Sequence, residues 1–283
     1  MIPRPRGGRV VLLDGGMGTA LIARGLPTGL LPEAWVLGRP WDVAAVHSSH
    51  AGAGAEVLLT CTFNLARLDL AGPDLDAFEV ARRAVALARL ARPGAVAGCV
   101  GATGLSGPAG RGPSPSEYRE RYGLACAALA AAGADLLWIE TQLDREEARA
   151  ALAAARRTGL PVVVTAFLVP APGGMATLDG SPGVDLLEAL WRDGAAAVGV
   201  NCVAPDEALV RLVAQAAARV PVPLVVKPNA GLPGEPLGTA DFAAGVAAAV
   251  RAGASLAGGC CGAGAEHLRM LAAATGRMLQ ARG

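Results

Sequence analysis

The chain has 283 residues, of which 53% are hydrophobic, enough to form a large apolar core. Its formal net charge of +1 comes from 25 basic and 24 acidic residues without a basic cluster, which argues against binding to nucleic acid or an anionic membrane surface. The first apolar run stops at Asp14, too early for a signal peptide or a membrane span. We therefore expect a cytoplasmic protein with its six cysteines reduced.

Short apolar runs alternate with helical patterns along the whole sequence. Strands are predicted at residues 10–13, 56–59, 95–100, 135–139, 161–168, 195–200, 223–227 and 255–257. Helices are predicted at residues 41–54, 74–91, 116–132, 144–158, 184–192, 205–219, 239–252 and 265–280. Eight such units predict an α/β fold, a single (β/α)8 TIM barrel, with residues 1–283 forming one domain. Loose loops are predicted at 104–115, where the length suits a lid, and at 170–183.

The first predicted strand ends in a glycine-rich loop that begins with Asp14, Gly15 and Gly16. Backbone amides in such a loop can bind a carboxylate or a phosphate, and glycines allow the ligand to come close. Asp14 could accept a hydrogen bond from an ammonium group. The same residues would also suit an ordinary turn between a strand and a helix, with Asp14 as a local cap.

Other candidate side chains follow the next strands. Glu140 comes directly after the fourth predicted strand, where barrel enzymes place active-site residues, although an exposed loop acid is the alternative. His47 and His50 lie on one face of a predicted helix and could bind a metal, but we favour packing. Packing roles are also expected for the remaining cysteines: Cys61, Cys99 and Cys126.

Three further cysteines follow predicted strands. Cys202 comes after the sixth strand, and the adjacent Cys260 and Cys261 stand among glycines after the eighth. Three thiols at strand ends, without an evident fourth protein ligand, favour a catalytic zinc site with one open position. The alternative for the adjacent pair is two small buried residues in a tight turn.

In a barrel, the carboxyl ends of all strands form one rim. Strands six and eight are two apart around this ring, so Cys202 can approach Cys260 and Cys261 despite the long sequence separation. The glycines beside the pair permit the irregular backbone that lets both thiols reach one ion. The same rim carries the remaining candidates, Asp14, Glu140, Asn201 and Asn229.

These segments together resemble the homocysteine S-methyltransferase family, in the family's order and from residue 10 to about residue 275. The motifs are Asp14-Gly-Gly-Met-Gly-Thr19, Thr60-Cys-Thr-Phe63, Glu140-Thr141, Gly199-Val-Asn-Cys202, Pro228-Asn-Ala-Gly-Leu-Pro233 and Gly258-Gly-Cys-Cys-Gly262. The resemblance implies a barrel that binds one Zn2+ through Cys202, Cys260 and Cys261. It also implies that Asp14 and Glu140 hold the amino group of L-homocysteine, and that amides of Gly15 and Gly16 hold its carboxylate. Asn201 and Asn229 are expected to bind substrate as well.

The expected chemistry is transfer of a methyl group to the homocysteine thiol, giving methionine. A free thiol has a pKa of about 8.5, and zinc would deprotonate it. The only tyrosines are Tyr118 and Tyr122, so the chain has few tyrosine rings that could form an aromatic cage around a quaternary-ammonium donor. Because no cobalamin or folate domain follows the last predicted helix, we expect a sulfonium donor, S-methylmethionine or S-adenosylmethionine. The alternative is the homocysteine-activating component of a multi-chain, cobalamin-dependent methionine synthase, with a cobalamin protein as partner.

Two hypotheses from other classes remain. Lys227 ends the seventh predicted strand, where a barrel aldolase could form a Schiff base with its substrate. The other hypothesis is a protein that binds homocysteine or zinc without catalysing methyl transfer. The first would leave the three rim cysteines without a role, so methyl transfer is the favoured interpretation.

Overall fold

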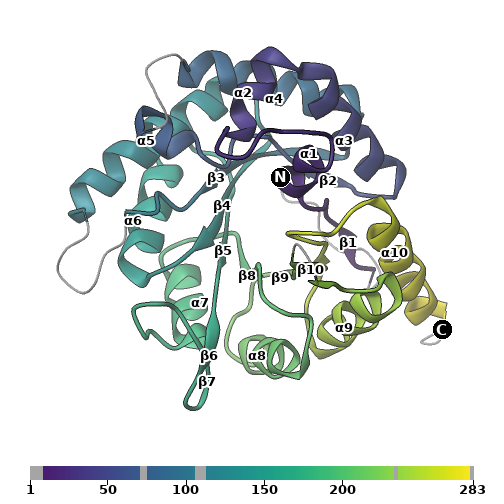
Figure 1. Ribbon diagram of the computed structural model, residues 1–283. Helices are drawn as coiled ribbons and strands as arrows, with labels where there is room; N and C mark the ends of the chain where they lie inside the picture. Colours follow the sequence, from purple (N-terminus) through teal and green to yellow (C-terminus); the bar gives the residue numbers. More distant parts are fainter. Residues whose placement is uncertain (1–8, 71–74, 106–112, 233–234, 281–283) are drawn as a thin grey trace.

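The computed structural model describes residues 9–70, 75–105, 113–232 and 235–280. Its centre is a ring of parallel strands with helices outside, which Figure 1 shows along the barrel axis. The ring is formed by β1 (Val11–Leu12), β2 (Val57–Leu59), β3 (Ala95–Gly101), β4 (Leu136–Gln142), β5 (Val162–Ala166), β8 (Ala197–Asn201), β9 (Leu224–Lys227) and β12 (Leu256–Ala257). This confirms the predicted (β/α)8 barrel.

The ring closes between its first and last strands. The sheet order is β1-β12-β9-β8-β5-β4-β3-β2, and a parallel bridge between Leu13 and Val57 connects the two ends of that order. Trp138 and Val225 belong to the apolar cluster contributed by the strands, which fills the barrel interior. A second, larger cluster lies between strands and helices. Because both faces of the strands are buried, their sequences are continuous apolar runs rather than alternating ones.

The helices outside the ring confirm the eight predicted ones with shifts of a few residues at their ends. They are α3 (Pro40–Gly52), α4 (Ala77–Leu90), α5 (Pro115–Ala131), α6 (Arg145–Arg156), α7 (Gly183–Arg192), α8 (Glu207–Ala217), α9 (Thr239–Ala252) and α10 (Ala265–Gln280). Side-chain caps such as Asp144, which accepts a hydrogen bond from the Glu147 amide, fix several of the helix starts.

Several short elements were not predicted. These are α1 (Met17–Ile22), α2 (Pro32–Gly38), the 3₁₀ helix η1 (Leu65–Leu70), and two hairpins, β6–β7 (Val169–Ala171, Gly174–Ala176) and β10–β11 (Gly231–Leu232, Glu235–Pro236). Both α1 and α2 lack a side-chain cap and are too short to show a helical period. The β6–β7 hairpin begins one residue before the loop predicted at 170–183 and otherwise lies within it. Residues 106–112 of the predicted lid lie outside the described residues.

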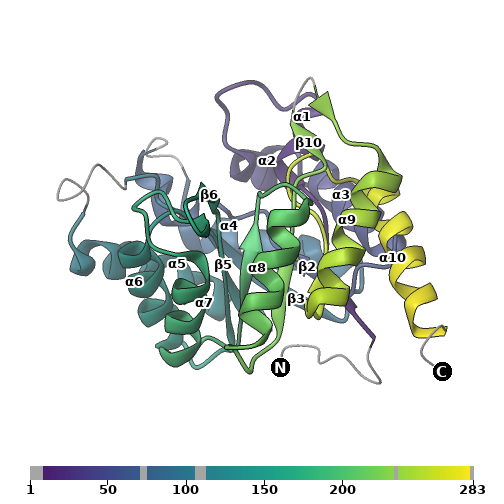
Figure 2. The same cartoon turned by 90° about the horizontal axis from the view of Figure 1, so that it is seen from below.

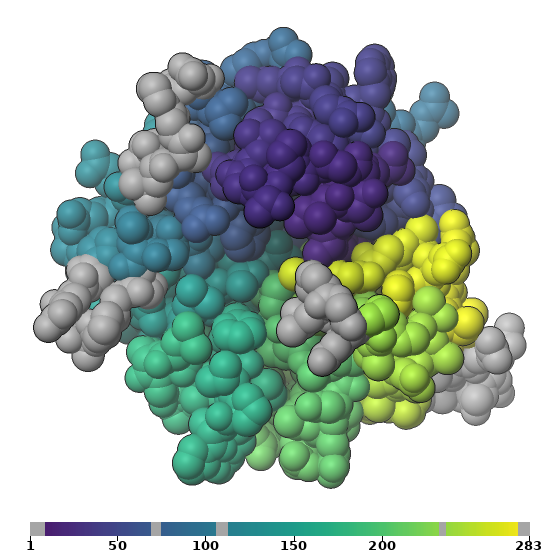
Figure 3. All heavy atoms as spheres, viewed as in Figure 1, coloured from purple at the N-terminus to yellow at the C-terminus, as the bar shows by residue number. Residues whose placement is uncertain are grey.

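Segments from the two ends of the sequence meet at the rim of the barrel. In Figure 3, the purple segment that follows β1 adjoins the yellow segment that follows β12. Figure 2 shows α1 and β10 at the same end of the barrel. The rim therefore combines the loops in which most candidate residues were predicted.

In the part of the chain that the structure describes, no helix is long and apolar enough to cross a membrane.

Candidate active site

The three predicted thiols come together at the rim. The Sγ atoms of Cys202, which follows β8, and of Cys260, which follows β12, are 2.6 Å apart. With Cys261 they form a group whose sulfur atoms all lie within 4.8 Å of one another. Among the described residues, this is the one group of three or more His, Cys, Asp or Glu side chains close enough to hold a metal ion. Hydrogen bonds from Cys202 and Cys260 lower the pKa of the Cys261 thiol.

The local backbone is what allows this convergence. Cys202 has a left-handed conformation with φ of 58°, which is rare for a residue other than glycine and costs about 1–3 kcal/mol. On the other side, Gly259 has no room for a side chain, because a Cβ atom there would lie 2.2 Å from the Cβ of Ala263. Strained backbone and obligatory glycine at the same three sulfur atoms indicate a site whose geometry matters for function.

Two asparagines hold the cysteine loops in place. Asn201 is buried, and its Nδ2 lies 3.4 Å from the Cys202 sulfur and 3.6 Å from the Cys260 sulfur, where it can donate to thiolates. Asn229 donates to the Cys202 carbonyl at 3.0 Å and accepts from the Cys261 amide at 3.1 Å. Both side chains thus support the sulfur cluster, and direct contact of either with a substrate stays a prediction.

Next to the sulfur atoms lies a buried group of charges. The Nζ atom of Lys227, at the end of β9, is 3.0 Å from Asp14 Oδ1 and 3.1 Å from Glu140 Oε1. Burial lowers the pKa of Lys227, but the two carboxylates outweigh this effect, so the net shift is upward and the amine stays charged. An ammonium group that is charged and hydrogen-bonded to two carboxylates is a poor nucleophile, which argues against the Schiff-base hypothesis.

The glycine-rich loop after β1 packs tightly beside the cysteine sulfur atoms and the buried charges. The Gly15 amide donates to Nδ1 of His50 at 3.4 Å, and the Gly16 amide donates to the Ala263 carbonyl at 3.0 Å. A Cβ atom at Gly16 would lie 2.5 Å from the Cys260 carbonyl, so only glycine fits. Both amides therefore have protein acceptors, and their contact with a substrate carboxylate stays a prediction.

One cavity connects the sulfur atoms with the charges. It encloses about 250 Å3, and its wall includes the three cysteines, the glycine-rich loop, Asp14, Glu140 and Lys227. The wall also contains Glu33 of α2, and Phe63 and other residues that follow β2. A molecule the size of an amino acid could therefore touch a sulfur ligand and a carboxylate at the same time.

Some residues of this region were not predicted. Burial raises the pKa of Glu33, which accepts hydrogen bonds from the backbone amide and side chain of Asn64 at 2.7 and 3.0 Å. Nothing in the sequence around Glu33 indicated this pairing. The sequence showed Lys227 as a charged residue at the end of an apolar strand, but it did not show which acids Lys227 contacts.

The histidines His47 and His50 and the remaining three cysteines are buried, as packing roles require. His47 is fully buried and has no hydrogen-bond partner among the residues that the structure describes, and burial lowers its pKa to about 4. Neither His47 nor His50 belongs to the group of described side chains that is close enough to hold a metal ion. Cys126 is buried in α5, whereas Cys61 and Cys99 are buried beside the cavity. Cys99 also donates a weak hydrogen bond to Glu140 Oε2 at 3.4 Å.

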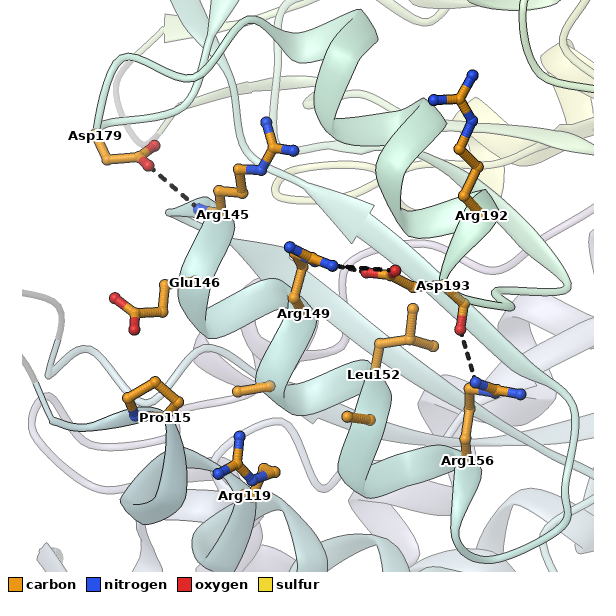
Figure 4. A pocket seen from close by; sticks show the side chains of 12 residues that line it. Pro115, Arg119, Arg145, Glu146, Arg149, Leu152, Arg156, Asp179, Arg192 and Asp193 are labelled. Carbon is orange, nitrogen blue, oxygen red and sulfur yellow. Dashed lines mark hydrogen bonds and ion pairs between the residues drawn. The ribbon is translucent and has the colours of Figure 1, made fainter.

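A larger hollow of about 800 Å3 lies on the outer surface and contains no cysteine. Figure 4 shows that its arginines come mainly from α6 and that two of them, Arg149 and Arg156, contact Asp193. Arg149 forms an ion pair with the Asp193 carboxylate at 2.6 Å, and Arg156 donates to its carbonyl at 2.8 Å. These contacts connect α6 to the end of α7, which gives the arginines a structural role.

The chain is similar in sequence and in fold to known proteins. A model of the homocysteine S-methyltransferase family matches residues 11–275, and the chain belongs to this family, as the sequence motifs indicated. Homocysteine S-methyltransferase 4 from Zea mays is 28% identical, over 94% of this chain and 90% of the relative. The metallated form of the homocysteine methyltransferase MmuM from Escherichia coli superimposes with a TM-score of 0.78 at 25% identity, covering 94% of this chain and 96% of the other.

Another relative is much longer than this chain. A methionine synthase from Mycobacterium tuberculosis is 30% identical over 94% of this chain, but the match spans only 24% of that protein. The resemblance to this relative therefore concerns one segment of it.

Proposed function

We propose that this protein transfers a methyl group to the thiol of L-homocysteine at a zinc ion held by Cys202, Cys260 and Cys261, giving methionine. The observation that carries the proposal is one cavity whose wall contains both the three thiols and the buried carboxylates. Family membership supports the acceptor substrate, and the metallated relative supports a metal. Because the thiols must stay reduced, this chemistry fits a cytoplasmic enzyme.

The donor set of the cluster fits zinc. Three sulfur ligands within 4.8 Å of one another suit a soft or borderline metal, and three protein ligands are typical of catalytic rather than structural zinc sites. When bound, zinc would lower the pKa of the homocysteine thiol, so that the thiol would lose its proton to solvent and its sulfur would stay a thiolate. Asn201 would donate to the sulfur atoms of Cys202 and Cys260 and so orient these two ligands.

The rest of the cavity would orient the substrate. The charge of the homocysteine ammonium group is matched by the buried acids Asp14 and Glu140. Its carboxylate would be bound by amides of the glycine-rich loop, in place of their present acceptors on His50 and Ala263. The sulfur then donates an electron pair to the methyl carbon of the donor, forming a new C–S bond. The bond between that carbon and the donor breaks, and its electron pair stays on the donor. Because no proton leaves the carbon, the chain needs no general base there, and its task is to hold the two reacting atoms in line.

For the donor we propose a sulfonium compound, S-methylmethionine or S-adenosylmethionine. Phe63 is the one aromatic residue among the described residues that line the cavity, and Tyr122 is buried elsewhere with its hydroxyl 2.8 Å from Glu147. An aromatic cage for a quaternary ammonium group is therefore not favoured. The alternative is a homocysteine-activating component that receives the methyl group from a cobalamin protein, which the partial match to a methionine synthase supports.

A donor screen tests the proposal. Zinc-loaded protein is incubated with deuterium-labelled homocysteine and each donor, and labelled methionine is measured by mass spectrometry. We expect labelled methionine with a sulfonium donor. Labelled methionine only with methylcobalamin would favour the alternative, and bound homocysteine without product from any donor would indicate a non-catalytic binding protein.

A further inference from the structure

Lys227 is the only lysine in the chain, and it lies beneath the proposed substrate cavity. Its side chain is 3% exposed, and its Nζ atom lies 5.6 Å from the ring centroid of Trp138 in the barrel interior. The same Nζ atom bonds to both Asp14 and Glu140. The lysine therefore forms the floor between the apolar barrel interior and the polar cavity.

The two carboxylates that it contacts are not equivalent. Both oxygen atoms of Asp14 have strong donors, because Oδ2 accepts from the Leu59 amide at 2.7 Å and Oδ1 accepts from Lys227 at 3.0 Å. In Glu140, Oε1 accepts from Lys227 at 3.1 Å, whereas within the described part of the chain Oε2 has only the weak thiol donor of Cys99 at 3.4 Å. Glu140 is therefore the acid with an oxygen atom still available to a ligand.

The charges of this group do not balance. Two carboxylates and one ammonium leave a net charge of −1 in a buried position, where an unpaired charge is costly. One additional cation would complete the group, and a second one would not be needed. Burial, together with the nearby Cys260 and Asp14, raises the pKa of Glu140, although the ammonium group of Lys227 lowers it.

We propose that Lys227 and Asp14 form an internally neutralised pair that positions Glu140, and that Glu140 Oε2 alone receives the ammonium group of the substrate. This inference rests on the proposed function and refines it. Lys227 acts as a positioning residue: it makes the site a seat for one cation and fixes the Glu140 carboxylate. Asp14 contributes through Lys227 rather than by direct contact with the substrate.

Two double variants with equal charge test this division. Asp14→Asn/Lys227→Met and Glu140→Gln/Lys227→Met each remove one acid together with the lysine, so each leaves a net charge of −1. For each, calorimetry of the zinc-loaded protein compares the affinity for homocysteine with that for 4-sulfanylbutanoate, which has the thiol and carboxylate but no amino group. A merely structural defect weakens both ligands, so the ratio of the two affinities reports only on ammonium recognition.

We expect the wild-type protein and Asp14→Asn/Lys227→Met to prefer homocysteine by similar factors, within about threefold. Glu140→Gln/Lys227→Met should lose at least about tenfold of that preference, which corresponds to ~1.4 kcal/mol. The inference is overturned if both double variants keep the preference, or if the Asp14 variant loses as much as the Glu140 variant. If wild-type protein shows no preference for homocysteine, the proposed function itself fails, which is a different outcome.

A measurement on the unaltered protein covers the case in which a double variant does not fold. Because the chain has a single lysine, ¹⁵N-lysine labelling gives one Nζ signal in nuclear magnetic resonance spectra. We expect the signal of a hydrogen-bonded ammonium, protected from exchange with water, both without and with homocysteine. Rapid exchange after homocysteine is added would mean that the substrate displaces Lys227, and the inference would be wrong.

Discussion

Replacing Cys202, Cys260 or Cys261 by serine is expected to lower the zinc content well below one ion per chain and to reduce methyl transfer. The loss of metal affinity or activity should exceed the roughly 10- to 100-fold that follows removal of a hydrogen-bond partner of a metal ligand, because here a ligand itself is lost. Zinc content is measured by atomic spectrometry and activity by the donor assay. Cys126→Ala is the matched control, since Cys126 is buried in α5 away from the cluster. Full zinc content in all three serine variants would contradict the assignment.

Removing the metal should stop catalysis without unfolding the protein. The strands and helices enclose two large apolar clusters that do not depend on the sulfur atoms, unlike the small core of a zinc finger. After chelation, the circular dichroism spectrum should therefore stay unchanged while methyl transfer is lost, and added zinc should restore it. If the metal-free protein unfolds, or if it remains active, zinc does not have the proposed role in thiol activation.

The second large effect is expected at Glu140. Glu140→Gln keeps an oxygen atom for Lys227 but removes the negative charge, so the buried charge group changes from −1 to zero. A hydrogen bond to a charged group contributes about 1.5–3 kcal/mol, so homocysteine should bind roughly 10- to 100-fold more weakly. Calorimetry with zinc-loaded protein measures the change.

Two controls accompany the Glu140 variant. Its zinc content should equal that of the wild-type protein, because Glu140 is not part of the sulfur cluster. Glu146→Gln changes an acid in the outer hollow of Figure 4 and should leave homocysteine binding unchanged. An unaltered affinity in Glu140→Gln would remove this acid from the substrate site.

The barrel and the sulfur cluster could be predicted because both depend on short-range signals. Buried parallel strands are continuous apolar runs, and the residues that follow them lie on one rim whatever the exact strand ends. Thus Cys202 and Cys260 could be brought together although β4 extends three residues beyond its predicted end, to Gln142. The family model then confirmed the resemblance that these motifs carried.

Other parts of the site depend on contacts that no local pattern encodes. The partners of Lys227 come from β1 and β4, far from β9 in the sequence. The left-handed conformation of Cys202 is accompanied by hydrogen bonds between Asn201 and Thr141, which is itself left-handed. The short α1 and α2 have no side-chain caps, and both pack against α3. Such features follow from the closed barrel and become visible only in three dimensions.

The central claim is that the homocysteine sulfur joins the three cysteine sulfurs at the metal. X-ray absorption at the zinc edge measures this directly, because it counts sulfur neighbours of the ion with and without homocysteine. We expect the number of sulfur neighbours to rise from three to four when homocysteine is added. An unchanged number of sulfur neighbours at saturating homocysteine would show that the substrate thiol binds away from the metal, and the proposed activation of the thiol would be wrong.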